Sequence, residues 1–153
     1  MDCLFVIDYQ KDFVDGALGF PGAEKIDAAI AARVREYGPG RVWFTRDTHF
    51  DDYLSTREGR HLPVPHCIDK LTFGMDIADP EILAKLPKET PEHIELCGLV
   101  SNICVISNAV VLQGHYPNAQ IVVDARLTDS FDRELQAKAL DVLAGLHADI
   151  RNR

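Results

Sequence analysis

The chain has 153 residues, of which 46% are hydrophobic and 26% are charged. This size and composition are typical of one globular domain and exclude a fibrous or disordered chain. With 24 acidic against 16 basic residues, the net charge is -8. That charge argues against nucleic acid or an anionic membrane as a partner, because both attract basic surfaces. No apolar run has the length of a membrane span or the pattern of a secretory signal. We therefore expect a single cytoplasmic domain over residues 1–153.

The four cysteines, Cys3, Cys67, Cys97 and Cys104, are expected to be reduced. A chain of this length can bury enough apolar surface to fold without disulfides, and without a secretory signal we place it in a reducing compartment. No two cysteines form a C-x-x-C pair, so they do not predict a structural zinc site.

Strand patterns and helix patterns alternate along the chain. Cys3–Ile7 is a short continuous apolar run, typical of a buried strand, and Glu24–Tyr37 has helical spacing and ends at Gly38-Pro39-Gly40. This order predicts an α/β fold with a parallel sheet and helices on both faces. The other expected elements are a strand at Arg41–Thr45, an irregular segment from Arg46 to about Pro80, a short helix at Pro80–Leu86, a strand at His93–Cys97, a helix at Ser101–Gln113, a strand at Gln120–Val123, a helix at Asp132–Leu146 and an edge strand at Asp149–Arg151.

Reactive side chains follow the first three predicted strands. Asp8 follows the first strand, Asp47 and His49 follow the second, and Cys104 comes shortly after the third. Because the carboxyl ends of parallel strands meet at one edge of a sheet, where ligands bind in such folds, these side chains are expected in one site.

Cys104 stands at the start of the predicted helix Ser101–Gln113. Backbone N–H groups at a helix N-terminus are unpaired and carry partial positive charge, which lowers the pKa of a thiol there and can hold an oxyanion. The alternative is a buried structural cysteine, a common environment for this residue. Position alone leaves both interpretations open.

The irregular segment carries a set of possible metal ligands. Asp47 and His49 are two residues apart, so in an extended chain they point the same way and can offer one oxygen and one nitrogen to one metal. Glu58, His61 and His66 follow in the same segment. The alternative is a solvated polar loop.

Together these motifs resemble the isochorismatase-like cysteine hydrolases, the superfamily that contains the nicotinamidases. The resemblance spans nearly the whole chain in the family's order. It implies a three-layer αβα sandwich around a Rossmann-like parallel sheet with the strand order 3-2-1-4-5-6. Four segments carry it: Phe5–Phe13, Phe44–His49, Leu62–Cys67 and Gly98–Val105.

The resemblance also implies catalytic roles. Asp8 corresponds to the general base and Cys104 to the nucleophile. Lys70, in a segment similar to the family's Lys-x-Thr-Phe-Gly turn, corresponds to the third catalytic residue, although most lysines are ordinary surface residues. The backbone N–H groups of Val100 and Cys104 would receive the oxyanion, next to a cis peptide bond at Leu99–Val100.

For the metal, the resemblance implies Asp47, His49, Glu58 and His66 as ligands. The middle ligand varies between His and Glu in the superfamily, so His61 is the alternative to Glu58. Such a mixed nitrogen and oxygen set suits a divalent metal, zinc first, with iron or manganese as alternatives.

One departure from the family lies between His66 and Lys70. The family usually has a helix and a further strand there, whereas only three residues separate the two here. Either the sheet lacks its edge strand, or one assignment is wrong. Lys85 and Lys88 are the weaker substitutes for Lys70.

The resemblance implies hydrolysis of a small amide through a thioester on Cys104, as in nicotinamide to nicotinate plus ammonia. Phe13 and Phe73 are candidates for an apolar wall around the substrate ring, with core packing as the alternative for each. The rival functions are hydrolysis of another small amide or an N-carbamoyl compound, and an inactive trimmed relative that serves as a binding or assembly module. We expect a homo-oligomer.

Overall fold

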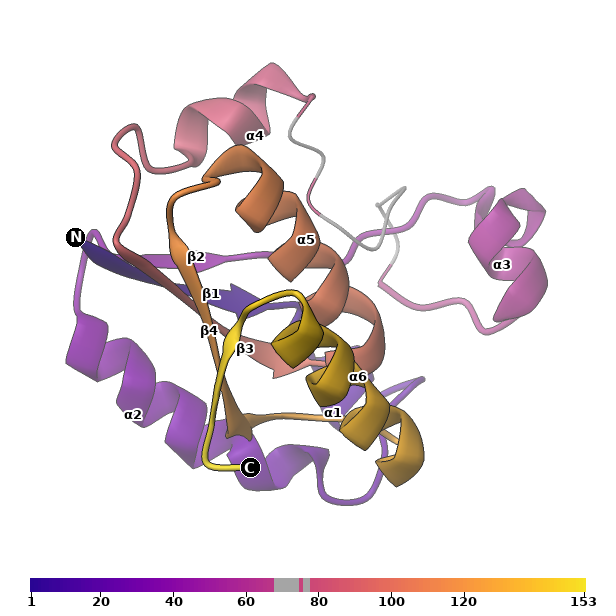
Figure 1. Cartoon of the computed structure of the whole chain (residues 1–153). Helices are drawn as coiled ribbons and strands as arrows, with labels where there is room; N and C mark the ends of the chain where they lie inside the picture. The colour runs from indigo at the N-terminus through magenta and orange to yellow at the C-terminus, as the bar shows by residue number, and fades with distance from the viewer. Residues whose placement is uncertain (68–74, 76–77) are drawn as a thin grey trace.

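The framework of the molecule is one five-stranded sheet with all strands parallel, in the order β2-β1-β3-β4-β5 (Figure 1). The structure is a computed structural model that describes residues 1–67, 75 and 78–153. The predicted α/β class is confirmed. The strands are β1 (Asp2–Ile7), β2 (Val42–Phe44), β3 (His93–Leu99), β4 (Gln120–Asp129) and β5 (Asp149–Arg151).

Helices cover both faces of this sheet, which gives three layers (Figure 1). The short helix α1 and the helix α2 lie on one face, whereas α4, α5 and α6 lie on the other. No helix in the described ranges is long and apolar enough to cross a membrane. The bounds are α1 (Lys11–Val14), a 3-10 turn η1 (Ala23–Ile26), α2 (Asp27–Tyr37), α4 (Pro80–Lys85), α5 (Ile106–His115) and α6 (Arg133–Gly145).

The central strand β1 shows why its sequence is continuously apolar. Successive side chains of a strand point to opposite faces. Phe5 therefore joins the core under α5 and α6, whereas Leu4 and Val6 join the core under α2. All three are buried because both faces are covered.

Among the described residues, the strand order matches the order implied by the resemblance without its edge strand. In the family order that strand would follow β2 along the chain and lie beside it in the sheet. Between β2 and β3 the described residues form turns and short helices, and no strand. The sheet edge at β2 agrees with the short connection between His66 and Lys70.

Two predicted strands were too short at their carboxyl ends. β3 continues to Leu99 and β4 to Asp129, and the pairing between them shifts register between Leu96 and Gly98. Gly98 permits this irregularity, because its φ of +113° favours glycine and a Cβ atom there would lie 2.0 Å from the carbonyl oxygen of Ile7.

The segment predicted to be irregular contains two short helical turns that sequence reasoning missed. They are η2 (Tyr53–Ser55) and α3 (Arg57–His61). Thr56 caps α3, because its Oγ1 accepts a hydrogen bond from the Gly59 N–H at 3.0 Å. Together with their flanks they form a lobe, residues 50–65, that stands away from the sheet (Figure 1). We call it the α3 lobe.

Candidate active site and metal centre

A cavity of about 860 Å³ brings together most of the predicted site residues. Segments from the carboxyl ends of β1, β2, β3 and β4 contribute to it, together with α3, as expected for a parallel sheet. Its volume lies in the range of small-molecule sites. The described residues that line it are Phe13, Ala17, Leu18, Gly19, Phe20, Asp47, Arg57, Glu58, His61, Leu62, His66, Val100, Ile103, Cys104 and Phe131.

Asp8 is fully buried at the carboxyl end of β1. Its φ of +43° lies in the left-handed region, which is rare for a non-glycine residue and is concentrated at functional sites. Thr45, which follows β2, fixes the carboxylate in two ways. The Thr45 hydroxyl donates to Asp8 Oδ1 at 2.5 Å and accepts from the Asp8 N–H at 3.0 Å. Sequence reasoning did not assign this role to Thr45.

Cys104 lies in the turn that joins β3 to α5, with its side chain buried and lining the cavity. The turn is a wide helical turn over Ser101–Val105 that precedes α5, so the predicted helix start was correct in place and too regular in form. The peptide bond Leu99–Val100 is cis, as the resemblance implied. The assignment of the oxyanion site to Val100 and Cys104 stays a prediction.

Two buried polar side chains hold this turn. Ser101 Oγ donates to the carbonyl of Asp129, at the end of β4, at 3.0 Å. Asn108 Nδ2 donates to the carbonyl of Cys104 at 2.9 Å, and Asn108 Oδ1 accepts from the N–H of Met75 at 2.9 Å. The turn that carries Cys104 is therefore tied to the end of β4, and Asn108 links it to Met75.

Four predicted metal ligands converge from β2, α3 and the segment after it. His49 Nε2 lies 3.2 Å from His66 Nε2, 3.2 Å from Asp47 Oδ2 and 3.4 Å from Glu58 Oε1. His66 Nε2 lies 3.5 Å from Asp47 Oδ2 and 3.9 Å from Glu58 Oε1. Ligands about 2.0–2.2 Å from a tetrahedral zinc ion are about 3.3–3.6 Å apart. Asp47, His49 and His66 present ligand atoms that all lie within 4.8 Å of one another, which fits a metal ion, and Glu58 approaches this triad through its two imidazoles.

The chemistry of this donor set also fits a cation. His66 Nδ1 lies 2.6 Å from the carbonyl of Val64. Because a carbonyl only accepts, Nδ1 carries a proton, and in neutral His66 the Nε2 atom presents a lone pair to the cluster. Burial lowers the pKa of His66, but hydrogen bonds to Asp47 and Val64 and the charges of Asp47 and Glu58 outweigh burial and raise it. The cluster attracts positive charge.

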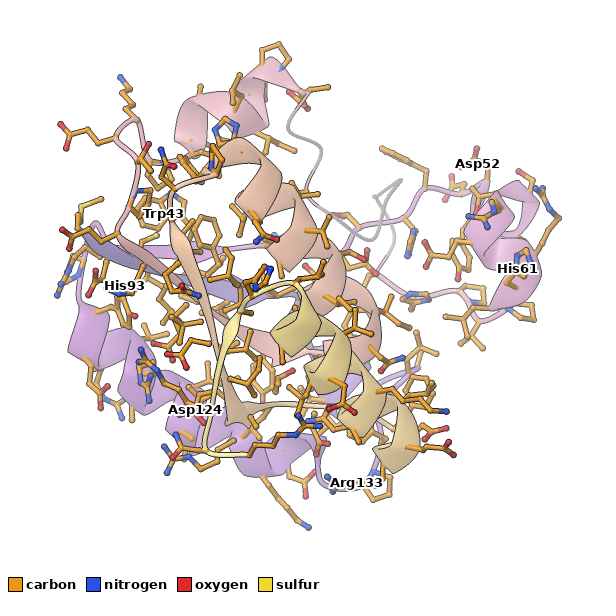
Figure 2. All side chains as sticks on the ribbon, in the orientation of Figure 1. Trp43, Asp52, His61, His93, Asp124 and Arg133 are labelled. Atoms are coloured by element: carbon orange, nitrogen blue, oxygen red, sulfur yellow. The ribbon has the colours of Figure 1, made fainter. Side chains whose placement is uncertain are left out.

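Glu58 and His61 occupy different positions on α3. Glu58 Oε1 approaches both imidazoles of the cluster. His61 is exposed, and its Nδ1 lies 2.7 Å from the carbonyl of Arg57. Figure 2 shows His61 on the α3 lobe, away from the sheet. The geometry favours Glu58 as the middle ligand.

Gln10 and Asp12 support the backbone around the predicted metal ligands, a role that sequence reasoning missed. The Gln10 amide bonds both backbone groups of Asp47: its Oε1 accepts from the Asp47 N–H and its Nε2 donates to the Asp47 carbonyl at 3.0 Å. Asp12 Oδ2 accepts from the N–H of Cys67 at 2.9 Å, which lowers the pKa of Asp12. The Cys67 carbonyl accepts from the N–H of His49. The alternating polar residues after Asp8 were the available signal.

Aromatic side chains form much of the cavity wall. Phe13 is buried and lies edge-on to His66, with ring centroids 5.6 Å apart. Phe13 lines the cavity and also packs in the core under α2, so its place beside a substrate stays a prediction. Phe20 and Phe131 also line the cavity and meet edge-on at 6.5 Å, and neither was predicted.

The remaining predicted residues do not add to the described site. Lys70 and Phe73 lie outside the described residues, so their roles stay predictions. Lys85 and Lys88, the substitutes for Lys70, are exposed near α4 and do not line the cavity. All four cysteines are free thiols, as predicted. Burial, assisted by the charges of Asp47 and Asp12, raises the pKa of Cys67 to about 12, which disfavours its thiolate.

Comparison with known proteins agrees with this architecture. The family model of the isochorismatase domain matches residues 2–152. No curated protein matches the sequence significantly. Several solved structures match it over almost their whole length.

Three of these structures are informative. The chain is similar to the pyrazinamidase/nicotinamidase of Streptococcus mutans, with a TM-score of 0.79, 22% identity, and coverage of 98% of this chain and 99% of that one. It is also similar to the pyrazinamidase of Pyrococcus horikoshii in complex with zinc, with a TM-score of 0.77, 19% identity, and coverage of 97% of each chain. A third similar structure is the N-carbamoylsarcosine amidase of Thermoplasma acidophilum, with a TM-score of 0.71, 19% identity, and coverage of 98% of this chain and 95% of that one. At these identities the likeness establishes the fold.

Proposed function

The chain belongs to the isochorismatase family and is an enzyme of the hydrolase class, and on that premise we propose that it is a cysteine-dependent amidohydrolase of the nicotinamidase type. One observation carries the proposal. A single cavity holds the thiol of Cys104 together with the donor set of Asp47, Glu58 and His66. A nucleophile and a substrate-orienting charge are thereby available to the same small amide.

In the first half of the reaction Asp8 accepts the proton of the Cys104 thiol. The thiolate attacks the carbonyl carbon, and a carbon–sulfur bond forms. The negative oxygen is received by the backbone N–H groups of Val100 and Cys104. The carbon–nitrogen bond then breaks, Asp8 returns the proton to the leaving nitrogen, and ammonia departs.

In the second half a water molecule replaces ammonia. Asp8 takes one proton from the water while its oxygen attacks the thioester carbon. The carbon–sulfur bond breaks, the proton returns to the sulfur of Cys104, and the carboxylic acid leaves. The two bonds from Thr45 keep the buried Asp8 carboxylate in place through both halves. Lys70 is proposed to hold Asp8 and the thiolate in register by charge pairing.

Asp47, His49, Glu58 and His66 would hold a divalent metal, with zinc proposed first. When bound, it would supply a positive charge that attracts a ring nitrogen or another basic atom of a substrate. The complex of the similar Pyrococcus horikoshii protein with zinc supports this choice of metal. Gln10 and Asp12 position the ligand segments.

Replacing Cys104 by Ala tests the proposal. Ammonia release is measured from nicotinamide, pyrazinamide and several N-carbamoyl amino acids with zinc-loaded protein. We expect turnover of at least one of them, lost by a factor of about 1,000 or more in the variant while its circular dichroism stays native. Val110→Ala on α5 is the matched control, because Val110 is 51% exposed and lies outside the cavity lining.

The rival, an inactive binding module, predicts a different outcome. Such a protein would release no ammonia from any of these amides. The rate of alkylation of Cys104 would rise only near the pH at which ordinary thiols ionise, and not at lower pH. Both results together would overturn the proposed function. Turnover that survives in Cys104→Ala would overturn the assignment of the nucleophile.

A further inference from the structure

We infer that α3 carries a subsite for a carboxylate, so that the substrate is an amide with an apolar group and an anionic end. This inference rests on the proposed function and specifies its substrate. Arg57 is the residue that carries it. Arg57 lines the cavity and stands next to Glu58, the proposed metal ligand on the same helix.

The first step is the charge of the cavity wall. The described lining contains two carboxylic acids, Asp47 and Glu58, and one guanidinium, that of Arg57. A divalent cation in the proposed centre balances the two carboxylates. One positive charge then remains, on Arg57, and an anionic ligand would neutralise it.

The second step is the state of the Arg57 guanidinium. Within the described part of the chain its side chain has no ion pair and no hydrogen bond; only its backbone carbonyl is engaged, by His61. Arg60, one turn further along α3, differs, because its guanidinium donates to the carbonyl of Ser55 at 2.5 Å. A guanidinium presents a planar fork of donors that matches a carboxylate in geometry as well as charge.

His61 adds a second polar group to this subsite. It lies one helical turn after Arg57, at i+4, so the two side chains share a face of the helix. Both line the cavity. Because its Nδ1 is committed to the Arg57 carbonyl, the other ring nitrogen, Nε2, is left to face a ligand.

The rest of the wall gives the ligand its apolar part. Phe20 and Phe131 form an edge-on pair, and Phe131 keeps 59% of its surface exposed although it lines the cavity. Leu18, Leu62 and Ile103 extend this surface. The volume of about 860 Å³ is far more than a single small ring fills. A substrate with an apolar side chain and a carboxylate uses the aromatic pair, the reactive centre and Arg57 together.

The test uses two ligands that differ in one charge, N-carbamoyl-phenylalanine and its methyl ester. Binding of each to the zinc-loaded Cys104→Ala protein is measured by calorimetry, so that no turnover interferes. We expect the acid to bind about tenfold more tightly than the ester, the loss typical of one charge-assisted hydrogen bond. In Arg57→Met we expect the ratio of the ester's dissociation constant to that of the acid to fall to near one. In Arg57→Lys this ratio should be partly retained.

Arg60→Met is the matched control, with the same charge removed from the same helix outside the cavity, and it should keep the ratio of the parent. An acid that does not bind, an acid-to-ester ratio near one in the parent, or a ratio that survives Arg57→Met would each overturn the subsite.

Ammonia release by the protein with Cys104 intact separates this inference from the proposed function. Binding that depends on Arg57 without release of ammonia from any amide supports the carboxylate subsite and counts against the hydrolase mechanism. Release of ammonia from amides, with no preference for the acid over its ester, supports the hydrolase mechanism and counts against the carboxylate subsite.

Discussion

Glu58 and His61 lie three residues apart on α3, and only their side-chain surroundings distinguish them as metal ligands. Glu58 faces His49 and His66, whereas His61 is exposed and bonds its own helix. The sequence offers both as the middle ligand, because His and Glu are both common zinc ligands. Their difference is set by the direction in which a five-residue helix is docked.

Replacing Glu58 by Gln should lower zinc affinity by at least about tenfold, because an anionic ligand becomes neutral. His61→Gln should leave the zinc affinity unchanged. Competition with a chromophoric chelator measures both. The opposite pattern, with weak binding in His61→Gln alone, would assign the middle ligand to His61.

At the scale of elements, β3 and β1 approach so closely that only glycine fits at one position. A Cβ atom at Gly98 would lie 2.0 Å from the carbonyl oxygen of Ile7, and the backbone there has a φ of +113°. This contact holds the end of β3, which leads into the turn with Cys104, against the strand that precedes Asp8. Gly98→Ala should therefore cost at least about 3 kcal/mol of the free energy of unfolding.

Gly145 on α6 is the matched control. A Cβ atom there meets nothing within 4 Å, so Gly145→Ala should stabilise the protein or leave it unchanged, within about 1 kcal/mol. Urea denaturation followed by circular dichroism compares the two. Equal stability of Gly98→Ala and the parent would show that β1 and β3 are not held in this register.

Contacts with the predicted metal ligands join the α3 lobe to the segments beside the sheet. Buried Tyr53 packs its ring 4.4 Å from that of His49 and 5.2 Å from that of His66, and Glu58 reaches the same two imidazoles. A bound cation would add its attraction to both carboxylates and both imidazoles, so loss of metal should loosen the lobe.

Limited trypsin digestion tests this link, because Arg57 and Arg60 lie within the α3 lobe. We expect cleavage at these two sites to be at least about tenfold faster after chelation than in zinc-loaded protein, read by mass spectrometry. Glu58→Gln should be cut rapidly even with zinc present. Identical rates with and without metal would contradict the role of the cluster in holding the lobe.

At the scale of the whole molecule, all four tyrosines are held in their protonated form. Burial, assisted by nearby carboxylates in three cases, raises the pKa of Tyr9, Tyr53 and Tyr116 to about 12, and that of Tyr37 is also raised. The ordinary value is 10.0. For Tyr116 the added charge is that of Cys3.

The stability of the protein should therefore fall as the pH rises above 10. Above pH 10 the unfolded chain ionises its tyrosines, whereas the folded protein keeps their protons. Because the unfolded state then binds fewer protons, rising pH lowers its free energy relative to the folded state. This contribution is complete below pH 10 and is lost as the pH approaches 12. Tyrosinate absorbance at 295 nm should appear late in native protein and near pH 10 in urea. Ionisation near pH 10 with native circular dichroism would contradict the burial.

Much of the architecture was predictable because it follows from local patterns of apolar and polar residues. The apolar run Cys3–Ile7 and the spacing in Asp132–Leu146 state the period of a strand and a helix, and their alternation leads to a parallel sheet. Since such sheets gather ligands at one edge, the positions of Asp8, Asp47, His49 and Cys104 predict one shared site, and the structure places Asp47 and Cys104 in the lining of one cavity. The predicted homo-oligomer and the roles of Lys70 and Phe73 stay predictions.

The tertiary structure alone decided how the site is supported. The Gln10 clamp on Asp47, the hydroxyl of Thr45 on Asp8 and the extension of β4 to Asp129 join segments tens of residues apart. The direction of Glu58 and the open guanidinium of Arg57 depend on where α3 is docked. The periodicity of apolar residues indicates which face of a helix or strand is buried. It does not indicate which residues, distant in the sequence, pack against that face.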